Sequence, residues 1–150
     1  MQRLTHLNAA GEASMVDVSS KPIVDREALA RGEIRLQQKT IRLIRSDRIA
    51  KGNVLAAARL AGIMAAKKTG ELIPLCHPLP ITHCEVAFRF PKTGDRIVIT
   101  ASAKITAQTG VEMEALVAVS VAALTIYDMC KAVDKKMRIS NVELVFKTKK

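Results

Sequence analysis

A stretch without charge constrains the fold of this chain most. No charged residue occurs from Ala115 to Tyr127, although 25% of the 150 residues are charged. The stretch lies within a predicted helix that follows Gly110 and runs from Val111 to about Val133. A helix that is apolar on every side is buried on every side. Because a small sheet covers only one side of such a helix, we expect the other side to pack against a second copy of the chain.

The other apolar patterns predict four strands and two further helices. The predicted strands are residues 22–36, 82–90, 97–105 and 138–147, and the predicted helices are residues 40–47 and 52–69. Asn53 is the expected N-cap of the longer of these helices, and we expect Val142, Leu144 and Phe146 to share one face of the last strand. The order is the split β-α-β-β-α-β, or ferredoxin-like, arrangement. It predicts an α+β fold, an antiparallel four-stranded sheet with its helices on one face.

The chain is expected to form one domain behind a leading arm. Residues 1–21 are small and polar without a clear period, so we predict a mobile N-terminal arm followed by a single ferredoxin-like domain over residues 22–150. The N-terminus lacks the apolar segment of a signal peptide, and no apolar run reaches the ~18 residues that span a bilayer. The three cysteines, an odd number, are typical of a reducing compartment. We therefore predict a cytoplasmic protein without a membrane partner.

The net charge of +10 predicts an anionic partner. Nucleic acid, a membrane surface and a phosphorylated small molecule are the candidates, and a basic surface that only confers solubility is the alternative. Single-stranded nucleic acid is usually bound by stacking on aromatic side chains. The chain has three Phe, one Tyr and no Trp, so nucleic acid is the weaker candidate.

Two cysteine–histidine pairs lie in the segment "LIPLCHPLPITHCEV". In the second pair, His83 and Cys84 are neighbours on a predicted strand and point to opposite faces. They cannot bind one ion together, so we predict no metal site, with Cys84 in the core and His83 on the surface. Cys76 and His77 lie between two prolines, which stiffen the loop. Such a loop either holds a functional histidine or only changes the direction of the chain, and the pattern leaves both alternatives open.

Charged residues near helix ends are further candidates for a site. Lys51 precedes the N-cap Asn53, where free N–H groups favour an anion such as phosphate, although a solvated lysine is the alternative. Asp128 and Lys131 are neighbours on one helix face, either as an ordinary ion pair or as part of a site. At 1.5 Å per residue, Glu112 lies roughly 24 Å from Asp128. One small-molecule site therefore uses both ends only if two such helices pack antiparallel across a two-fold axis.

Four long segments resemble the molybdenum cofactor biosynthesis protein C family, the cyclic pyranopterin monophosphate synthases. They are "LNAAGEASMVDVS", "AKGNVLAAARLAGIMAAKKT", "LIPLCHPL" and "TGVEMEALVAVSVAALTIYDMCKAVDKKM". The resemblance implies a ferredoxin-like lyase that acts on a nucleotide-derived triphosphate, 3',8-cyclo-7,8-dihydro-GTP. This compound is rearranged to cyclic pyranopterin monophosphate, and pyrophosphate is released. The resemblance also implies a homohexamer, a trimer of dimers, with each active site at a dimer interface.

The resemblance also implies residue roles by motif. Lys51 is implied as a catalytic lysine in the same site as His77, while Asp128 and Lys131 form a catalytic pair contributed across the interface. The implied substrate-binding residues are Leu75, Cys76, His77, Glu112, Met113 and Glu114, together with Arg26, Lys67 and Lys147 around the phosphates. No metal ligand and no protein-bound cofactor is implied, and magnesium accompanying the triphosphate is left open. Gln108 stands where some relatives have Lys or Arg, so one phosphate contact is either missing or supplied elsewhere.

The alternative hypothesis is a basic ferredoxin-like module that binds nucleic acid. The net charge and the C-terminal "KTKK" support this hypothesis. The sequence lacks the signature of aromatic residues on the sheet that RNA-recognition domains carry. Turnover of the cyclised nucleotide favours the enzyme, whereas salt-dependent RNA binding that does not need Asp128 favours the module.

Overall fold

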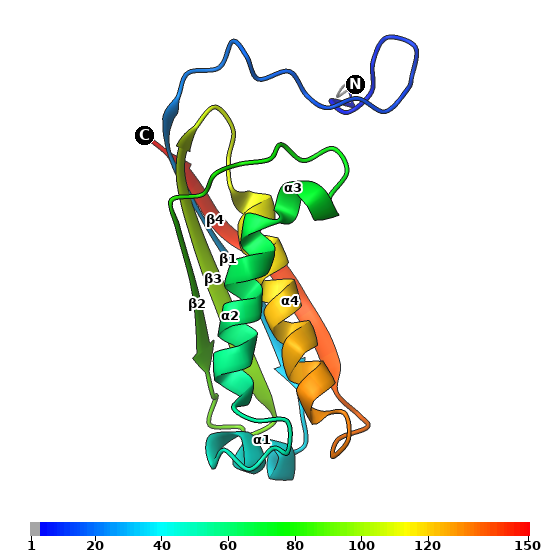
Figure 1. Cartoon of the computed structure of the whole chain (residues 1–150), viewed down its shortest axis with the longest axis vertical. Helices are drawn as coiled ribbons and strands as arrows, with labels where there is room; N and C mark the ends of the chain where they lie inside the picture. Colours follow the sequence, from blue (N-terminus) through cyan, green and yellow to red (C-terminus); the bar gives the residue numbers. More distant parts are fainter. Residues whose placement is uncertain (1–3) are drawn as a thin grey trace.

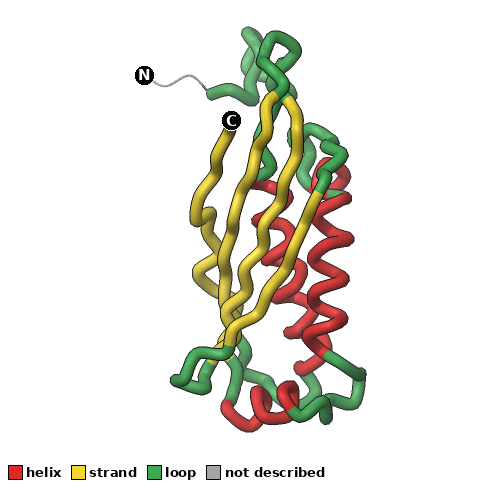
Figure 2. Tube along the Cα trace, turned by 90° about the vertical axis from the view of Figure 1, so that its left-hand side faces the viewer, coloured by secondary structure: helices red, strands yellow, loops and turns green. Residues whose placement is uncertain are grey.

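The computed structural model describes residues 4–150, so the first three residues of the predicted arm lie outside it. The described residues form strands and helices in the order β1 (Val24–Arg35), α1 (Gln38–Arg45), α2 (Val54–Lys67), α3 (Thr69–Leu72), β2 (His83–Arg89), β3 (Arg96–Ala107), α4 (Glu112–Cys130) and β4 (Arg138–Lys149). The strands form one layer, and α2 and α4 lie side by side over one of its faces (Figures 1 and 2).

The sheet confirms the predicted ferredoxin-like topology. Its strand order is β2-β3-β1-β4, and each neighbouring pair of strands is antiparallel. The two central strands, β1 and β3, pair without interruption from Val24 opposite Ala107 to Arg35 opposite Arg96. The sheet is therefore regular in its centre, and irregular pairing is confined to the β4 edge.

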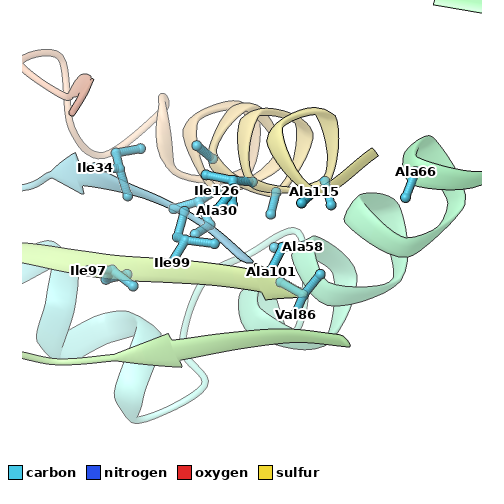
Figure 3. Close-up of a cluster of buried hydrophobic side chains, with 14 of the residues drawn as sticks. Ala30, Ile34, Ala58, Ala66, Val86, Ile97, Ile99, Ala101, Ala115 and Ile126 are labelled. Atoms are coloured by element: carbon cyan, nitrogen blue, oxygen red, sulfur yellow. The ribbon is translucent and has the colours of Figure 1, made fainter. Parts of the chain in front are cut away.

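The core between the sheet and the two long helices is aliphatic, as the composition predicts. The buried side chains on the helix-covered face of the central strands are Ala28, Ala30 and Ile34 of β1 and Ile97, Ile99, Ala101, Ala103 and Ile105 of β3. The five β3 residues share one face, as predicted. Ala58 and Ala66 of α2 and Ala115 and Ile126 of α4 complete this cluster from the helical side (Figure 3).

Glycine allows α4 to lie close to two neighbouring elements. A Cβ atom on Gly62 of α2 would lie only 2.8 Å from the backbone oxygen of Ala118 in α4. A Cβ atom on Gly32 of β1 would lie 2.7 Å from Cγ1 of Val119 on the same helix. Contacts this short do not occur between real Cβ atoms and their neighbours, so both close approaches depend on glycine.

The uncharged helix α4 is covered by its own chain on two sides, by the sheet and by α2. Ala118 and Ala122 are fully buried and face α2 near Gly62, whereas Leu124 is 57% exposed. The face that remains for a partner therefore includes Leu124 and excludes Ala118 and Ala122. By length and composition α4 could also cross a membrane, but half of the tested segment is buried inside the chain, and core helices of soluble proteins pass the same test.

The edge strand β4 departs from the predicted alternation. Phe146 pairs with Leu29, whereas Leu144 pairs with Ala30. Because Leu29 and Ala30 are consecutive in β1, their partners face opposite sides of the sheet. A β-bulge between these pairs adds one residue to β4 and reverses the direction of the side chains beyond it. The prediction that Val142, Leu144 and Phe146 share one face is therefore wrong for Phe146.

Several element boundaries also differ from the prediction. The first strand begins two residues later than expected, and α1 begins two residues earlier. The uncharged helix ends at Cys130 rather than near Val133, because the chain turns there through bonds from the Val133 and Asp134 N–H groups to the Cys130 carbonyl. The helix α3 was not predicted, since four residues are too few to show a helical period.

A buried carboxylate joins the turn after α4 to the start of α1. Asp134 is 2% exposed and accepts hydrogen bonds from the Gln37 N–H, the Thr40 hydroxyl and the Lys136 N–H, at 2.8, 2.8 and 3.0 Å. Burial by itself raises the pKa of Asp134, but these hydrogen bonds outweigh burial and hold the pKa below its usual value. Asp134 thus acts as a cap for α1, although Gln37 is the residue at the N-cap position.

We predict that Asp134→Ala lowers the free energy of unfolding by roughly 2–4 kcal/mol, because three donors around a buried site lose a charged acceptor. Urea denaturation measures this loss. Asp25→Ala serves as the control, since Asp25 is exposed and accepts one hydrogen bond, from Thr106. The control should cost less than about 1 kcal/mol. Equal effects of the two substitutions would contradict the capping role.

Candidate active site

The loop that contains Cys76 and His77 is held against α3. A Cβ atom on Gly70 of α3 would lie 2.8 Å from Cα of Pro78, so the helix and the loop touch through their backbones. The Cys76 N–H bonds to the Ile73 carbonyl at 3.1 Å and closes a turn. The loop is therefore fixed at one end of the molecule, beside the start of α4.

A cavity of about 660 Å³ lies between this loop, the start of α4 and the N-terminal arm. We call it the arm cavity. Its lining residues are Thr5, His6, Val16, Val18 and Lys21 of the arm, Ile73, Pro74, Leu75, Cys76, His77 and Leu79 of the loop, and Thr109, Gly110, Glu112 and Met113. A mostly apolar cavity of this volume, with a few polar groups, is typical of a site for a small organic ligand.

A smaller cavity of about 320 Å³ adjoins the arm cavity, and we call it the basic cavity. Both cavities are lined by Lys21, Thr109, Gly110 and Glu112. The basic cavity adds three further cations, which are Arg26, Lys147 and Lys149. An apolar space next to a cluster of cations can accommodate a ring system that carries phosphate groups.

Glu112 lies where the two cavities meet. Its Oε1 accepts a hydrogen bond from Lys147 Nζ at 3.2 Å, while its Oε2 is buried without a partner among the described residues. Arg26 donates from Nε and Nη2 to the carbonyls of Ala107 and Gln108, both at 3.1 Å. Arg26 thus orients the connection between β3 and α4 as well as lining the basic cavity.

Glu114 lines neither cavity, although Glu112 and Met113 before it do. Its side chain is 1% exposed, and its Oε2 has no hydrogen-bond partner among the described residues. Burial raises the pKa of Glu114 to about 7, against a smaller opposing effect of its own N–H, and the charge of Glu112 adds to the rise. Burial and these two carboxylates also raise the pKa of the Cys76 thiol, which disfavours a thiolate nucleophile there.

A second cluster lies at the other end of α4. Lys51 Nζ is 3.3 Å from Asp128 Oδ2 and donates to the Asp128 carbonyl at 3.1 Å, and Lys131 Nζ is 2.9 Å from Asp128 Oδ1. Hydrogen bonds from Lys131 and then Lys51 lower the pKa of Asp128, and the bond to Asp128 raises the pKa of Lys131. The three side chains are about half exposed, so the cluster is open to a ligand or a partner.

The structure corrects the predicted grouping of the catalytic residues. Lys51 lies beside Asp128 of its own chain and not beside His77, so the prediction that Lys51 and the Asp128–Lys131 pair come from opposite chains is wrong. Helix α4 separates this cluster from Glu112 by roughly 24 Å. Lys67 lies at the end of α2 and lines neither cavity. The other predicted substrate-binding residues, apart from Glu114, line one or both cavities.

A profile of the MoaC family matches residues 15–150. The chain belongs to the MoaC family. A cyclic pyranopterin monophosphate synthase of Dinoroseobacter shibae is 58% identical over 149 residues, which are 98% of this chain and 93% of that protein. Proteins of the same name from Chloroflexus aggregans and Parvibaculum lavamentivorans are 56% and 54% identical, each over 98% of this chain, and the matches cover 89% and 92% of those proteins.

Sequence patterns missed part of the cavity wall in this member of the MoaC family. Lys21 lines both cavities, and Val16 and Val18 line the arm cavity, although residues 1–21 were predicted only as a mobile arm. The apolar side chains at 16 and 18, followed by a lysine at the junction with β1, were the available signal. Whether the arm moves stays a prediction.

No cluster of three or more His, Cys, Asp or Glu side chains that could hold a metal ion occurs within residues 4–150. Cys84 is partly buried against the core and His83 is exposed, as their opposite directions on β2 predict. The absence of a zinc site in this MoaC-family chain stays a prediction. All three cysteines are unpaired.

We predict that Glu114→Gln stabilises the protein at pH 8 but not at pH 4. The raised pKa means that the folded state holds a proton which the unfolded state releases above pH 4.5. Stability from this proton is therefore full below pH 4.5 and is lost as the pH rises to about 7. Glutamine stays neutral, so the variant should gain roughly 3 kcal/mol at pH 8. Urea denaturation at both pH values measures the gain, and an equal effect at pH 4 and pH 8 would exclude a protonated Glu114.

Proposed function

We propose that this chain is a cyclic pyranopterin monophosphate synthase. The observation that carries the proposal is identity above 50% over nearly the whole chain to several proteins of that name. The proposed reaction rearranges the cyclised guanosine triphosphate derivative to cyclic pyranopterin monophosphate and releases pyrophosphate. The protein is thus proposed to be a lyase of molybdenum cofactor biosynthesis, acting in the cytoplasm.

The two adjoining cavities fit the two chemical parts of this substrate. The fused rings are proposed to occupy the arm cavity, against Leu75, Met113 and His77. The triphosphate is proposed to lie in the basic cavity, where Lys21, Arg26 and Lys147 offset its charge. Lys147 then exchanges its bond with Glu112 for a phosphate oxygen. Magnesium bound to the triphosphate at this end of the substrate is tested below with a chelator.

The catalytic cluster is proposed to reach the substrate from a second chain. Lys51, Asp128 and Lys131 lie at the end of α4 remote from the cavities, so one chain supplies only half of the site. Antiparallel packing of two α4 helices across a two-fold axis brings the cluster of one chain to the cavities of the other. The exposed side of α4 at Leu124 is available for this contact. We propose that such dimers assemble further into a homohexamer, a trimer of dimers.

The cluster is suited to proton transfer and to charge stabilisation. C–N bonds are broken and formed during the rearrangement, and these steps require proton carriers. The contact with Asp128 raises the pKa of Lys131 and so favours its ammonium form, which can offset the charge of the phosphates. In the last step a ribose-derived hydroxyl attacks the α-phosphorus, its proton leaves, and the bond to the pyrophosphate group breaks. Cations around the leaving pyrophosphate stabilise its growing charge.

We predict that the purified protein converts the cyclised nucleotide triphosphate and releases one pyrophosphate for each product molecule. Asp128→Asn should reduce kcat by at least about 100-fold, because it removes the carboxylate that holds both lysines. Coupled pyrophosphate detection and product fluorescence measure both steps, with and without a chelator to test for magnesium. No turnover by the wild-type protein with fresh substrate would refute the proposed function. Salt-dependent RNA binding unaffected by Asp128→Asn would then favour the nucleic-acid hypothesis.

We predict that two inactive variants restore activity when mixed only if one defect lies at the arm cavity and the other lies in the Asp128 cluster. Lys131→Ala and His77→Ala chains, mixed in equal amounts through unfolding and reassembly, should form about half of their dimers as hybrids. One site of each hybrid receives both defects and the other receives none, so activity returns to roughly a quarter of the wild-type value.

The matched control mixes Lys51→Ala with Lys131→Ala. Both residues contact Asp128 within one chain, so every site of this mixture keeps a defect and no activity should return. Mass spectrometry verifies hybrid formation in both mixtures. Activity in the control mixture, or none in the first mixture, would reject a site shared in this way.

A further inference from the structure

The N-terminal arm is attached to the domain by a glutamine. Gln108 Nε2 donates to the backbone carbonyls of Ser19 at 3.1 Å and Lys21 at 3.3 Å. The backbone of Gln108 is itself fixed, because its carbonyl accepts from Arg26 Nη2. The neutral amide of Gln108 therefore directs its donors to the arm.

The same arm reaches the histidine of the arm cavity. His77 Nε2 lies 2.7 Å from the carbonyl oxygen of Val16, and Val16 is half-buried against the cavity. A carbonyl oxygen can only accept a hydrogen bond, so Nε2 must carry the proton. In the neutral ring the other nitrogen, Nδ1, is then the acceptor. Nδ1 has no hydrogen-bond partner among the described residues, and His77 lines the arm cavity.

We propose that Gln108 is a positioning residue that holds the Val16 carbonyl against His77 and so keeps Nδ1 of the ring as a hydrogen-bond acceptor for the substrate. Gln108 does this through the chain between its two acceptors and Val16, without touching the substrate. The arm between these points is ordered by its own hydrogen bonds, since the Ser19 N–H donates to Asp17 Oδ1 and the Lys21 N–H donates to the Val18 carbonyl. The catalytic part of this proposal rests on the proposed function, whereas the effect on the histidine ring does not.

The test uses the full chain with 15N-labelled histidine and NMR of the ring nitrogens. Variants of His6 and His83, each changed to Asn, assign the His77 signals. Gln108→Met keeps the length and neutrality of the side chain but removes both donors. Gln38→Met is the matched control, because Gln38 is exposed at the start of α1, at the opposite end of the sheet from the arm. The wild type and the control should show the Nε2-protonated ring at pH 8, and Gln108→Met should show a mixture of both tautomers.

Hydrogen exchange and activity complete the test. Amide protection of the arm at Lys21, whose N–H bonds to the Val18 carbonyl, should fall in Gln108→Met alone. Its kcat/KM should fall by about 30-fold, as expected for the loss of two ordinary hydrogen bonds. Gln108→Lys retains a donor and should recover most of the wild-type tautomer and activity.

Three results would overturn the proposal. The first is a wild-type ring protonated on Nδ1, and the second is an unchanged His77 tautomer in Gln108→Met. The third is a changed tautomer with unchanged kcat/KM, which would show that the acceptor nitrogen is not used. If the wild type has no turnover, the proposed function fails together with the catalytic part of this proposal. The NMR result alone then decides whether Gln108 determines the tautomer of His77.

Discussion

The tight packing of α4 against β1 and α2 determines where the chemistry of this protein lies. Two glycines make it possible, since Gly32 leaves room for Val119 and Gly62 leaves room for the backbone at Ala118. A larger residue at either position would push the helix away from the aliphatic core, and interiors this dense tolerate little added volume. The buried helix is also a rigid spacer. It holds the carboxylates at its start and the Asp128 cluster at its end roughly 24 Å apart.

This separation leaves one chain with two distant clusters, which we propose to be the two halves of one site. The half at the start of α4 has the cavities and the cations of the basic cavity, and the half at its end has a carboxylate between two lysines. The half-sites differ in solvation as well. Glu114 is buried and its pKa is raised, whereas Asp128 is exposed to water and its pKa is lowered by its lysines. Membership of the MoaC family and the antiparallel pairing of helices lead to the same proposal of a shared site.

The arm shows how a segment with little burial can still shape a site. Most of its side chains are exposed, yet it supplies one wall of the arm cavity and one hydrogen bond to His77. Its attachment is polar, through carbonyl groups that accept from Gln108 and His77. Such contacts are individually worth about 1 kcal/mol. An attachment of this strength can hold the arm in place and still be released at little cost.

The sequence by itself determined the order of the strands and of the three longer helices and the core faces of β2 and β3, because alternation and the uncharged stretch of α4 are local patterns. The order of these elements along the chain also indicated the ferredoxin-like sheet topology. The sequence also identified the lysines and acids near both ends of α4. Only the tertiary structure decided that Lys51 lies against Asp128, 77 positions away along the chain. It also decided that a bulge places Phe146 and Leu144 on opposite faces of the sheet. Local periodicity contains no information on which distant segments touch or where a strand gains a residue, because both depend on how packed elements fit together in space.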